Sequence, residues 1–242
     1  MNKVSWKSRT ELLIGKDKSE ALQKAHVLVA GLGGVGGYAA ELLCRAGIGK
    51  LTLVDNDIVQ DSNRNRQLAA LCSTEGKLKV EVIAERLKDI NPEIQIVKYS
   101  VFLSEENLAE IIGQPYDFII DAIDTLTPKV LLLKEAVSRG RKAVSSMGSG
   151  GKINPEIICV DDISGSHHCK FAYKVRKYLH KYGIYQGITV VYSPESVRKE
   201  VIVETDGTGN KRSQVGTISF MPAMFGCYCA AEVIKGLLSG ES

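Results

Sequence analysis

The amino-acid sequence predicts an α/β protein with a doubly wound, mainly parallel sheet. Apolar runs of strand length alternate with segments of helical period, and a glycine-rich turn follows the first run. No internal repeat or low-complexity linker divides the 242 residues, so we expect a single domain. Within it we expect a core over residues 1–150 and, over residues 151–242, an extension that ends in a buried helix.

The alternation of elements is regular in the core and breaks down after it. Expected strands of the core cover residues 26–30, 51–54, 94–99, 118–121 and 143–146. Expected helices of the core cover residues 35–46, 76–90, 105–112 and 128–139. Expected elements of the extension are short strands at 157–160, 188–192 and 200–204, a basic helix at 170–182 and a glycine-containing loop at 206–210. We expect this extension to enlarge the sheet and to cover the site.

Composition and charge exclude several classes of protein. The chain is 44% hydrophobic and 24% charged, which is typical of a globular protein, and a net charge of +3 does not by itself indicate nucleic-acid binding. The six cysteines form no C-x-x-C pair, so we expect reduced thiols and no zinc knuckle. The N-terminal residues are charged where a secretory signal needs an apolar run, which predicts a cytoplasmic protein.

An apolar segment over residues 218–238 raises the possibility of a membrane span. Pro222, Glu232 and Lys235 interrupt it, and it has no long charge-free centre. We therefore expect a buried core helix and no membrane partner.

A glycine turn follows the first expected strand. Gly31, Gly33 and Gly36 form the pattern G-x-G-x-x-G, with Gly34 inside it, directly before an expected helix. Backbone N–H groups and the helix N-terminus can meet a phosphate there, and Asp55 at the end of the second strand can accept ribose hydroxyls. This predicts a Rossmann-like nucleotide site, although NAD and ATP fit it equally well. The plainer alternative is a glycine turn that only allows tight strand–helix packing.

The loop after Asp55 favours ATP over a nicotinamide cofactor. In "DNDIVQDSNRNRQ" it places Asp57, Asn63, Arg66 and Gln67 at the carboxyl end of the second strand, where ligands bind such sheets. A triphosphate in a cleft needs cationic donors, and the guanidinium of Arg66 is a planar fork for phosphate oxygens. Hydride transfer does not need this loop. Taken alone, Arg66 is better explained as a solvated loop residue.

Two further segments add a lysine and two carboxylates. Lys79 stands near the start of an expected amphipathic helix, and "DAID" places Asp121 and Asp124 at the end of a strand. Carboxylates at that position suit Mg²⁺, which proteins hold with one or two carboxylates plus phosphates. The plainer alternatives are a solvated helix face for Lys79 and a helix N-cap for Asp124.

In this order, GLGGVG, Asp55, SNRNRQ, Lys79 and DAID resemble the family of ubiquitin-activating-type adenylyltransferases, which includes the ThiF, MoeB and HesA proteins. The resemblance spans about residues 9–145 and implies that ATP adenylates a carboxylate. It implies roles in this chemistry for Gly33, Asp55, Asn63, Arg66, Gln67 and Lys79, and it makes Asp124 the magnesium-associated carboxylate. It also implies a homodimer in which Arg9 reaches the phosphates of the neighbouring subunit's ATP, although the sequence itself shows only an arginine in a short expected helix.

The segments "RTELLIG", "INPE", "DAIDTLTPK" and "GSGGKINPEIICVDDI" resemble the branch of this family that dehydrates threonylcarbamoyladenosine in tRNA. This implies a tRNA substrate whose threonyl carboxylate is adenylated before ring closure. The main alternative is an activating enzyme for a ubiquitin-like or sulfur-carrier protein with a C-terminal diglycine. A hydride-transfer enzyme and a noncatalytic nucleotide-binding regulator are further alternatives. "SGSHHCKFAYK" and "DGTGN" depart from the branch's pattern.

The basic helix contains two stripes and follows a cysteine. Residues of the first stripe are Lys170, Lys174, Lys177 and Lys181. Residues of the second are Phe171, Val175, Tyr178 and Tyr182. We expect the second stripe to pack and the first to face tRNA phosphate or, in the plainer interpretation, solvent. Cys169 is a candidate for capturing the acyl group as a thioester, although a lone cysteine is more often incidental.

Overall fold

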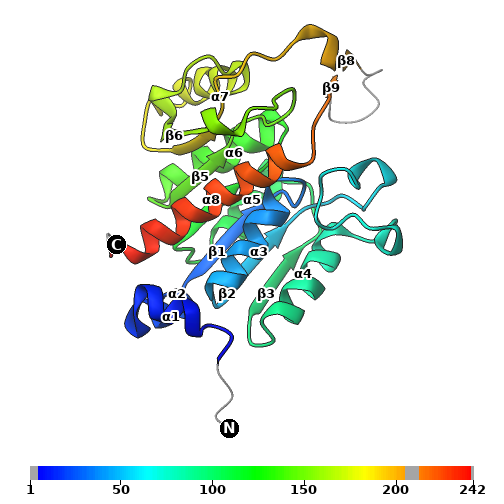
Figure 1. Ribbon diagram of the computed structural model, residues 1–242. Helices are drawn as coiled ribbons and strands as arrows, with labels where there is room; N and C mark the ends of the chain where they lie inside the picture. The colour runs from blue at the N-terminus through cyan, green and yellow to red at the C-terminus, as the bar shows by residue number, and fades with distance from the viewer. Residues whose placement is uncertain (1–4, 205–212, 241–242) are drawn as a thin grey trace.

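A seven-stranded sheet forms the centre of the computed structural model, which describes residues 5–204 and 213–240 (Figure 1). Its strands run in the order β3-β2-β1-β4-β5-β7-β6. Every neighbouring pair is parallel except β7 and β6, which are antiparallel at one edge. The predicted doubly wound, mainly parallel sheet is therefore confirmed, and the extension adds two strands to it.

The strands lie close to their predicted positions. They are β1 (His26–Ala30), β2 (Lys50–Val54), β3 (Gln95–Tyr99), β4 (Phe118–Asp121), β5 (Lys142–Ser146), β6 (Cys159–Asp162) and β7 (Thr189–Tyr192). β1 is buried along its whole length, as expected for the central strand of a parallel sheet. Its side chains alternate between two cores, with Val27 and Val29 on one face and Leu28 and Ala30 on the other.

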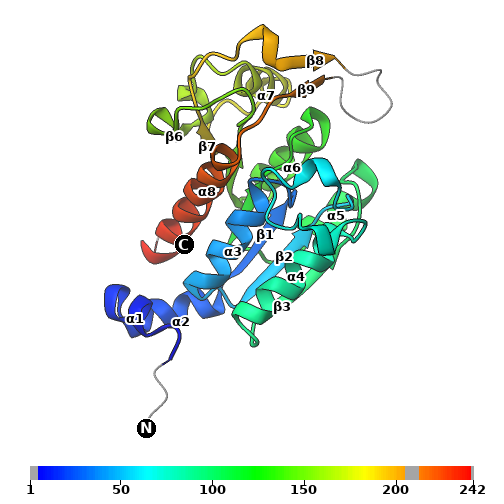
Figure 2. The same ribbon diagram turned by 45° about the vertical axis from the view of Figure 1, so that its right-hand side comes forward.

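Helices cover both faces of the sheet (Figure 2). One face is covered by α3 (Gly36–Ala46), α4 (Lys79–Ile90) and α8 (Phe220–Leu238). The other is covered by α5 (Glu105–Ile112), α6 (Leu126–Ser138) and α7 (Lys170–His180). The chain starts with α1 (Ser8–Ile14) and α2 (Lys16–Lys24), which lie beyond the amino ends of the first two strands.

The C-terminal apolar segment forms α8, as expected. Among the described residues, α8 is the one helix that is long and apolar enough to cross a membrane, judged by length and composition alone. It packs against α3 and against β4, β5 and β7. Met221, Phe225, Cys229 and Val233 are buried in the core between them, so one face of α8 belongs to the protein core.

Several local predictions were wrong at their boundaries. α4 begins at Lys79 instead of residue 76, because Gly76 has φ +80° and Leu78 pairs with Ile58 in an isolated bridge. The strand expected at 200–204 is a 3-10 turn followed by β8 (Ile202–Glu204), which pairs with the unpredicted β9 (Ser213–Val215). The helix α2 was not predicted either. The loop expected at 206–210 lies outside the described residues.

Candidate active site

The glycine turn connects the end of β1 to the start of α3. Gly31 has φ +86°, and a Cβ there would lie 2.7 Å from the carbonyl oxygen of Ala122. A Cβ on Gly36 would overlap the carbonyl oxygen of Gly31. Packing therefore requires both of these glycines. A Cβ on Gly33 would meet only the Gln67 amide at 3.8 Å, so packing does not require glycine there, which fits close approach of a ligand.

Asp55 ties the end of β2 to this turn. Its Oδ2 accepts a hydrogen bond from Leu32 N at 2.6 Å, and its Oδ1 accepts one from Asp57 N at 2.7 Å. Burial raises the pKa of Asp55, whereas the Lys79 ammonium and the two N–H groups act in the opposite direction. Asp55 remains partly exposed, so its other lone pairs can accept donors such as ribose hydroxyls.

Lys79 is the first residue of α4 and is only 4% exposed. Its Nζ donates to Asp57 Oδ2 at 2.7 Å. A solvated face, the plainer expectation for this lysine, is therefore wrong. The ammonium keeps two further N–H donors beside the loop that holds Asp57.

Arg66 and its neighbours form a compact loop after a 3-10 turn over Asp61–Asn63. Asn63 is buried and its Oδ1 accepts from Gln60 N at 3.2 Å, which fixes the turn. Arg66 Nη1 donates to Ser62 O at 2.9 Å and to Asn65 Oδ1 at 2.7 Å. These bonds orient the guanidinium and leave its other donors for an anion.

Gln67 contains an unsatisfied atom next to the glycine turn. Its Oε1 is buried and has no hydrogen-bond partner among residues 5–204 and 213–240. Buried polar atoms are nearly always paired, so an unpaired one calls for an explanation. The Gln67 atom nearest to Gly33 is Nε2, so this amide lies beside the turn. An amide at this place whose oxygen is satisfied by no described protein group fits a bound nucleotide.

Asp121 at the end of β4 is not available to a metal ion. It is fully buried, and its Oδ2 accepts from Lys129 Nζ at 2.6 Å and from Ser145 Oγ at 2.5 Å. Lys129 Nζ also donates to Ser146 O at 3.0 Å, and Asp121 Oδ1 accepts from Ile123 N at 3.1 Å. The expectation that Asp121 suits Mg²⁺ is therefore wrong, because this carboxylate neutralises a buried lysine.

Lys129 and Ser145 were missed in the sequence, although they support the loop that follows β4. A lysine among the leucines of α6 was the available indication. A buried ammonium needs a carboxylate partner, and the strand-terminal Asp121 supplies it. The pair fixes the start of the segment 122–124 that contacts the glycine turn.

Asp124 lies in that segment and is exposed. It is not the N-cap of α6, since Thr125 occupies that position, so the plainer expectation for Asp124 is wrong. In the described part of the chain, no group of three or more His, Cys, Asp or Glu side chains could hold a metal. A single carboxylate beside a phosphate site fits Mg²⁺ only if phosphate oxygens complete its ligands.

Arg9 lies in α1, as expected, and is exposed. α1 lies beyond the amino ends of the strands (Figures 1 and 2). The glycine turn follows the carboxyl end of β1, and Asp124 follows the carboxyl end of β4. The structure therefore brings together the other predicted site residues but does not place Arg9 with them. α1 buries none of its residues, and Leu12 and Leu13 are 89% and 84% exposed.

The extension contacts the loop after β2, residues 55–67, which we call the nucleotide loop. Asn65 Nδ2 donates to Thr217 O at 2.9 Å, which joins the loop to the segment before α8. A cavity of about 670 Å³ lies at this junction. Its lining includes Asn65, Gly151, Lys152, Arg198 and Thr217. The buried Lys152 braces one wall by donating to Ser193 O at 2.7 Å and to Glu195 O at 2.9 Å.

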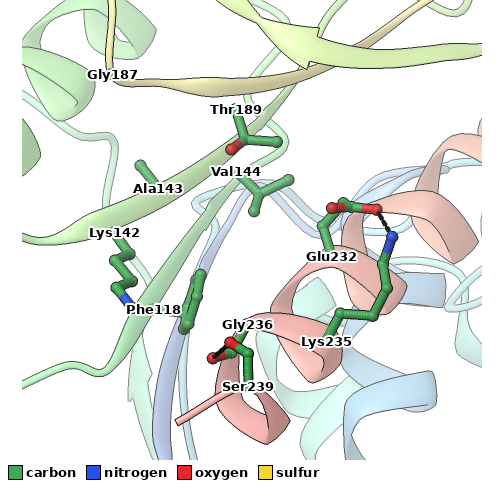
Figure 3. Close-up of a pocket in the computed structure, with 10 residues that line it drawn as sticks. All are labelled: Phe118, Lys142, Ala143, Val144, Gly187, Thr189, Glu232, Lys235, Gly236 and Ser239. Atoms are coloured by element: carbon green, nitrogen blue, oxygen red, sulfur yellow. Dashed lines mark hydrogen bonds and ion pairs between the residues drawn. The ribbon is translucent and has the colours of Figure 1, made fainter. Parts of the chain in front are cut away.

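A second cavity lies at the opposite end of the sheet (Figure 3). It has a volume of about 390 Å³ and lies between the starts of β4, β5 and β7 and the last turns of α8. Phe118 and Lys142 line one side, and the ion pair of Glu232 with Lys235 lines the other. It contains none of the predicted site residues.

In α7, the stripe that was expected to pack is only partly buried. Its buried residues are Ala172, Val175 and Leu179. Phe171 is partly buried, but Tyr178 and Tyr182 are exposed, so the expectation that they pack is wrong. A tyrosine can be placed on either side of a helix's apolar stripe because its ring is amphipathic.

Cys169 directly precedes α7 and is buried. Its Sγ accepts a long hydrogen bond from Ala172 N at 3.5 Å and so caps the helix. The geometry gives this thiol a structural position, and the thioester route remains a prediction.

A glycine turn at the carboxyl edge of a doubly wound sheet, followed by an acidic residue at the end of the next strand, defines the class of Rossmann-like nucleotide-binding proteins. Comparison with known sequences identifies the family within this class. The model of the ThiF family matches residues 8–241, and the chain belongs to this family.

Individual relatives cover the chain to different extents. A tRNA threonylcarbamoyladenosine dehydratase of Bacillus subtilis is 39% identical over 238 residues, which span 96% of this chain and 94% of the relative. The crystal structure of Escherichia coli tRNA N6-threonylcarbamoyladenosine dehydratase, TcdA, in complex with ATP superposes with a TM-score of 0.88 at 32% identity, covering 99% of this chain and 97% of that one. The adenylyltransferase and sulfurtransferase UBA4 of Candida glabrata is 38% identical over 148 residues, which span 61% of this chain and 34% of UBA4.

Proposed function

We propose that this chain is an ATP-dependent dehydratase of threonylcarbamoyladenosine in tRNA, acting in the cytoplasm. The observation that carries the proposal is the likeness to the Bacillus subtilis dehydratase along 96% of the chain. Such a likeness includes the extension as well as the nucleotide-binding core. The ATP complex of the Escherichia coli relative supports ATP as the co-substrate.

ATP would bind across the glycine turn and the loop after β2. The turn Gly31–Gly36 would bind phosphate with backbone N–H groups, with Gly33 and Gly34 nearest to it. Asp55 would accept the ribose hydroxyls, and Gln67 would gain the partner that its buried Oε1 lacks. The remaining members of this proposed site are Asp57, Asn63, Arg66 and Lys79.

The proposed reaction has two steps, both at the threonyl carboxylate. A carboxylate oxygen attacks the α-phosphate of ATP, the bond to the β-phosphate breaks, and pyrophosphate leaves. A nitrogen of the same modification then attacks the adenylated carbonyl carbon and loses its proton. AMP leaves with one carboxylate oxygen, so the modified base loses one water.

The protein contributes position and charge to these steps rather than a covalent bond. Lys79 can keep its bond to Asp57 while it donates to a phosphate oxygen, and Arg66 has unused N–H donors. Asp124 is the residue that would hold Mg²⁺ together with phosphates, and this ion would supply positive charge to the triphosphate. Lys129 would act only as a positioning residue, because it is buried beneath the segment of Asp124.

A homodimer would complete this site. Arg9 belongs to α1, which lies at the end of the sheet opposite the site of its own chain. The nearby Leu12 and Leu13 are the most exposed of the large hydrophobic side chains described. An apolar patch on a helix that buries nothing of its own favours a protein partner. We propose that this partner is a second copy, whose phosphate site Arg9 would reach.

Pyrophosphate exchange into ATP tests the function. We expect exchange with tRNA that contains threonylcarbamoyladenosine, and none with the same tRNA lacking the modification. A diglycine-tailed carrier protein serves as the competing substrate in a parallel reaction. Exchange driven by the carrier and not by modified tRNA would contradict the proposal.

Activation of a ubiquitin-like or sulfur-carrier protein is the second candidate function. The 38% identity to UBA4, an adenylyltransferase and sulfurtransferase, favours it for the adenylation core. That likeness covers 61% of the chain, however, whereas the likeness to the dehydratases includes the extension. A sulfur-transfer or carrier protein as an additional partner is tested by the same carrier arm of the exchange assay.

A further inference from the structure

The segment that contains α7 has positive charges and no acidic residue. Residues 163–194 include no Asp or Glu and include five Lys and Arg. The guanidinium of Arg176 is bonded to the backbone, at 2.7 Å from Ser166 O. The exposed face of α7 and the turn after it contains four lysines, opposite the buried Ala172, Val175 and Leu179. These lysines are Lys170, Lys174, Lys177 and Lys181. The neighbouring carboxylate of Asp162 is bonded to the N–H groups of Ser164 and Gly187, so it does not pair with these lysines.

Four tyrosines accompany these lysines and are all exposed. Tyr173, Tyr178, Tyr182 and Tyr185 are 58%, 42%, 48% and 61% exposed. At 100° per residue, Tyr173 and Tyr178 fall on either side of the lysine row of α7. Lys181 Nζ lies 4.7 Å from the centroid of the Tyr178 ring, and Lys134 Nζ of α6 lies 5.0 Å from that of Tyr182. We define the RNA platform as α7 with the turn after it, residues 170–185.

We propose that the RNA platform binds the unpaired loop of a folded RNA, with lysines on phosphates and tyrosines stacked on bases. A polyanion fits a surface that has only positive charges, whereas a second copy of this surface would repel it. Exposed aromatic rings beside lysines distinguish single-stranded from double-stranded RNA, because only unpaired bases offer their faces for stacking. The inference rests on the proposed function for the identity of the RNA, because that function makes the folded RNA a tRNA.

The RNA platform is connected to the candidate active site. A Cβ on Gly148 would lie 3.7 Å from the Phe171 side chain in the first turn of α7. Three residues later, Gly151 lines the 670 Å³ cavity that also contacts Asn65 of the nucleotide loop. A loop held on the RNA platform would therefore have an adjacent cavity for one extruded nucleoside.

Fluorescence anisotropy with two labelled RNAs tests the proposal. One is an unmodified hairpin with an unpaired loop, and the other is a blunt duplex of the hairpin's stem. For Tyr173→Ala/Tyr178→Ala we expect hairpin affinity to fall about tenfold or more, since stacking is worth about 1–3 kcal/mol per base. The duplex should bind as weakly to the variant as to the unchanged protein. Tyr173→Phe/Tyr178→Phe is the matched control and should stay within about twofold, because phenyl rings still stack.

A lysine variant measures the electrostatic part separately. Lys174→Gln/Lys177→Gln should weaken the binding of both RNAs. It should also lower the slope of log affinity against log salt by about 0.7 for each phosphate that the protein no longer neutralises. Thermal unfolding of each variant controls for folding. If the alanine variant is destabilised, Tyr173→Leu/Tyr178→Leu keeps apolar bulk without a ring and should show the same loss of hairpin affinity.

Two outcomes would overturn the proposal. One is unchanged hairpin affinity in the alanine and leucine variants, and the other is an equal loss on hairpin and duplex. Tyrosine-dependent binding to vesicles with anionic lipids, without any effect on hairpin binding, would assign the surface to a membrane instead. None of these measurements uses ATP or a modified base. If the proposed reaction fails, the binding result on hairpin and duplex still holds. If the RNA platform fails to bind RNA, the proposed reaction is not contradicted.

Discussion

The nucleotide side and the substrate side of the site are built in opposite ways. On the nucleotide side, Asp55 is bonded to the backbone, and Lys79 and Asp121 are each bonded to a side chain of opposite charge. On the substrate side, the lysines and tyrosines of α7 extend into solvent. The first arrangement fixes where a phosphate would react, and the second leaves a surface that a macromolecule can complete. Bonds that fix charged groups within the fold, more than charge itself, distinguish the part that positions chemistry from the part that recognises a partner.

The strongest test of the nucleotide side removes Lys129. Lys129→Met leaves the Asp121 carboxylate buried without its cation, and we expect the free energy of unfolding to fall by about 3–5 kcal/mol. Urea denaturation measures this. The double variant Lys129→Met/Asp121→Leu replaces the pair by apolar groups and should recover most of the loss. If the single variant is as stable as the unchanged protein, the pair does not brace this side of the site.

The next test asks whether Arg66 and Asp124 act on the phosphates of ATP. We expect Arg66→Ala and Asp124→Ala each to lower pyrophosphate exchange by about 10²–10³-fold, since preorganised charge contributes this much to catalysis. The fold should survive, because both side chains are at least partly exposed. Arg64→Ala is the matched control, as Arg64 lies in the same loop, pairs with Asp61, and should leave exchange within about twofold. Near-normal exchange in both test variants would refute the assignment.

A pH measurement extends the comparison to the amino end of the sheet. His26 is buried on β1 and bonded to Thr52 Oγ1 at 2.8 Å, and burial together with Lys50 lowers the pKa of His26 to about 4. The folded protein holds this imidazole neutral, whereas the unfolded chain binds a proton below about pH 6.5. Stability from this group is therefore present above pH 6.5 and lost as the pH falls toward 4. We expect a loss of about 2 kcal/mol between pH 7 and pH 5.

The control for this pH dependence is His26→Gln, which cannot take up the proton. Denaturant unfolding at both pH values should show a smaller loss in the variant by about the same 2 kcal/mol. Equal losses in the two proteins would mean that His26 is not held neutral.

The smallest expected effect belongs to Cys169. Cys169→Ser keeps a side chain able to cap α7, so we expect turnover within about twofold and a change in stability below about 1 kcal/mol. Steady-state release of AMP measures the turnover. Loss of turnover with intact pyrophosphate exchange would instead support a thioester step.

Much of the fold was predictable because its periodicity is strong. The bounds of β1, β4 and α5 match their predictions, as does the glycine turn that joins strand to helix. The pairing of Asp121 with Lys129 was not predictable, since a helical lysine looks solvated until a partner strand is placed beside it. The exposure of Tyr178 and Tyr182 was missed for a related reason. Helical spacing groups residues on a face, but tertiary contacts decide how far around the helix burial extends.

We propose that the site activates a carboxylate of a modified base and that a ring then closes. Incubation of the protein with ATP and tRNA containing threonylcarbamoyladenosine, followed by measurement of nucleoside masses and AMP together, tests both steps. We expect a nucleoside lighter by one water, and one AMP for each molecule converted. Unchanged nucleoside mass, with ATP consumed only when a diglycine-tailed protein is added, would contradict it.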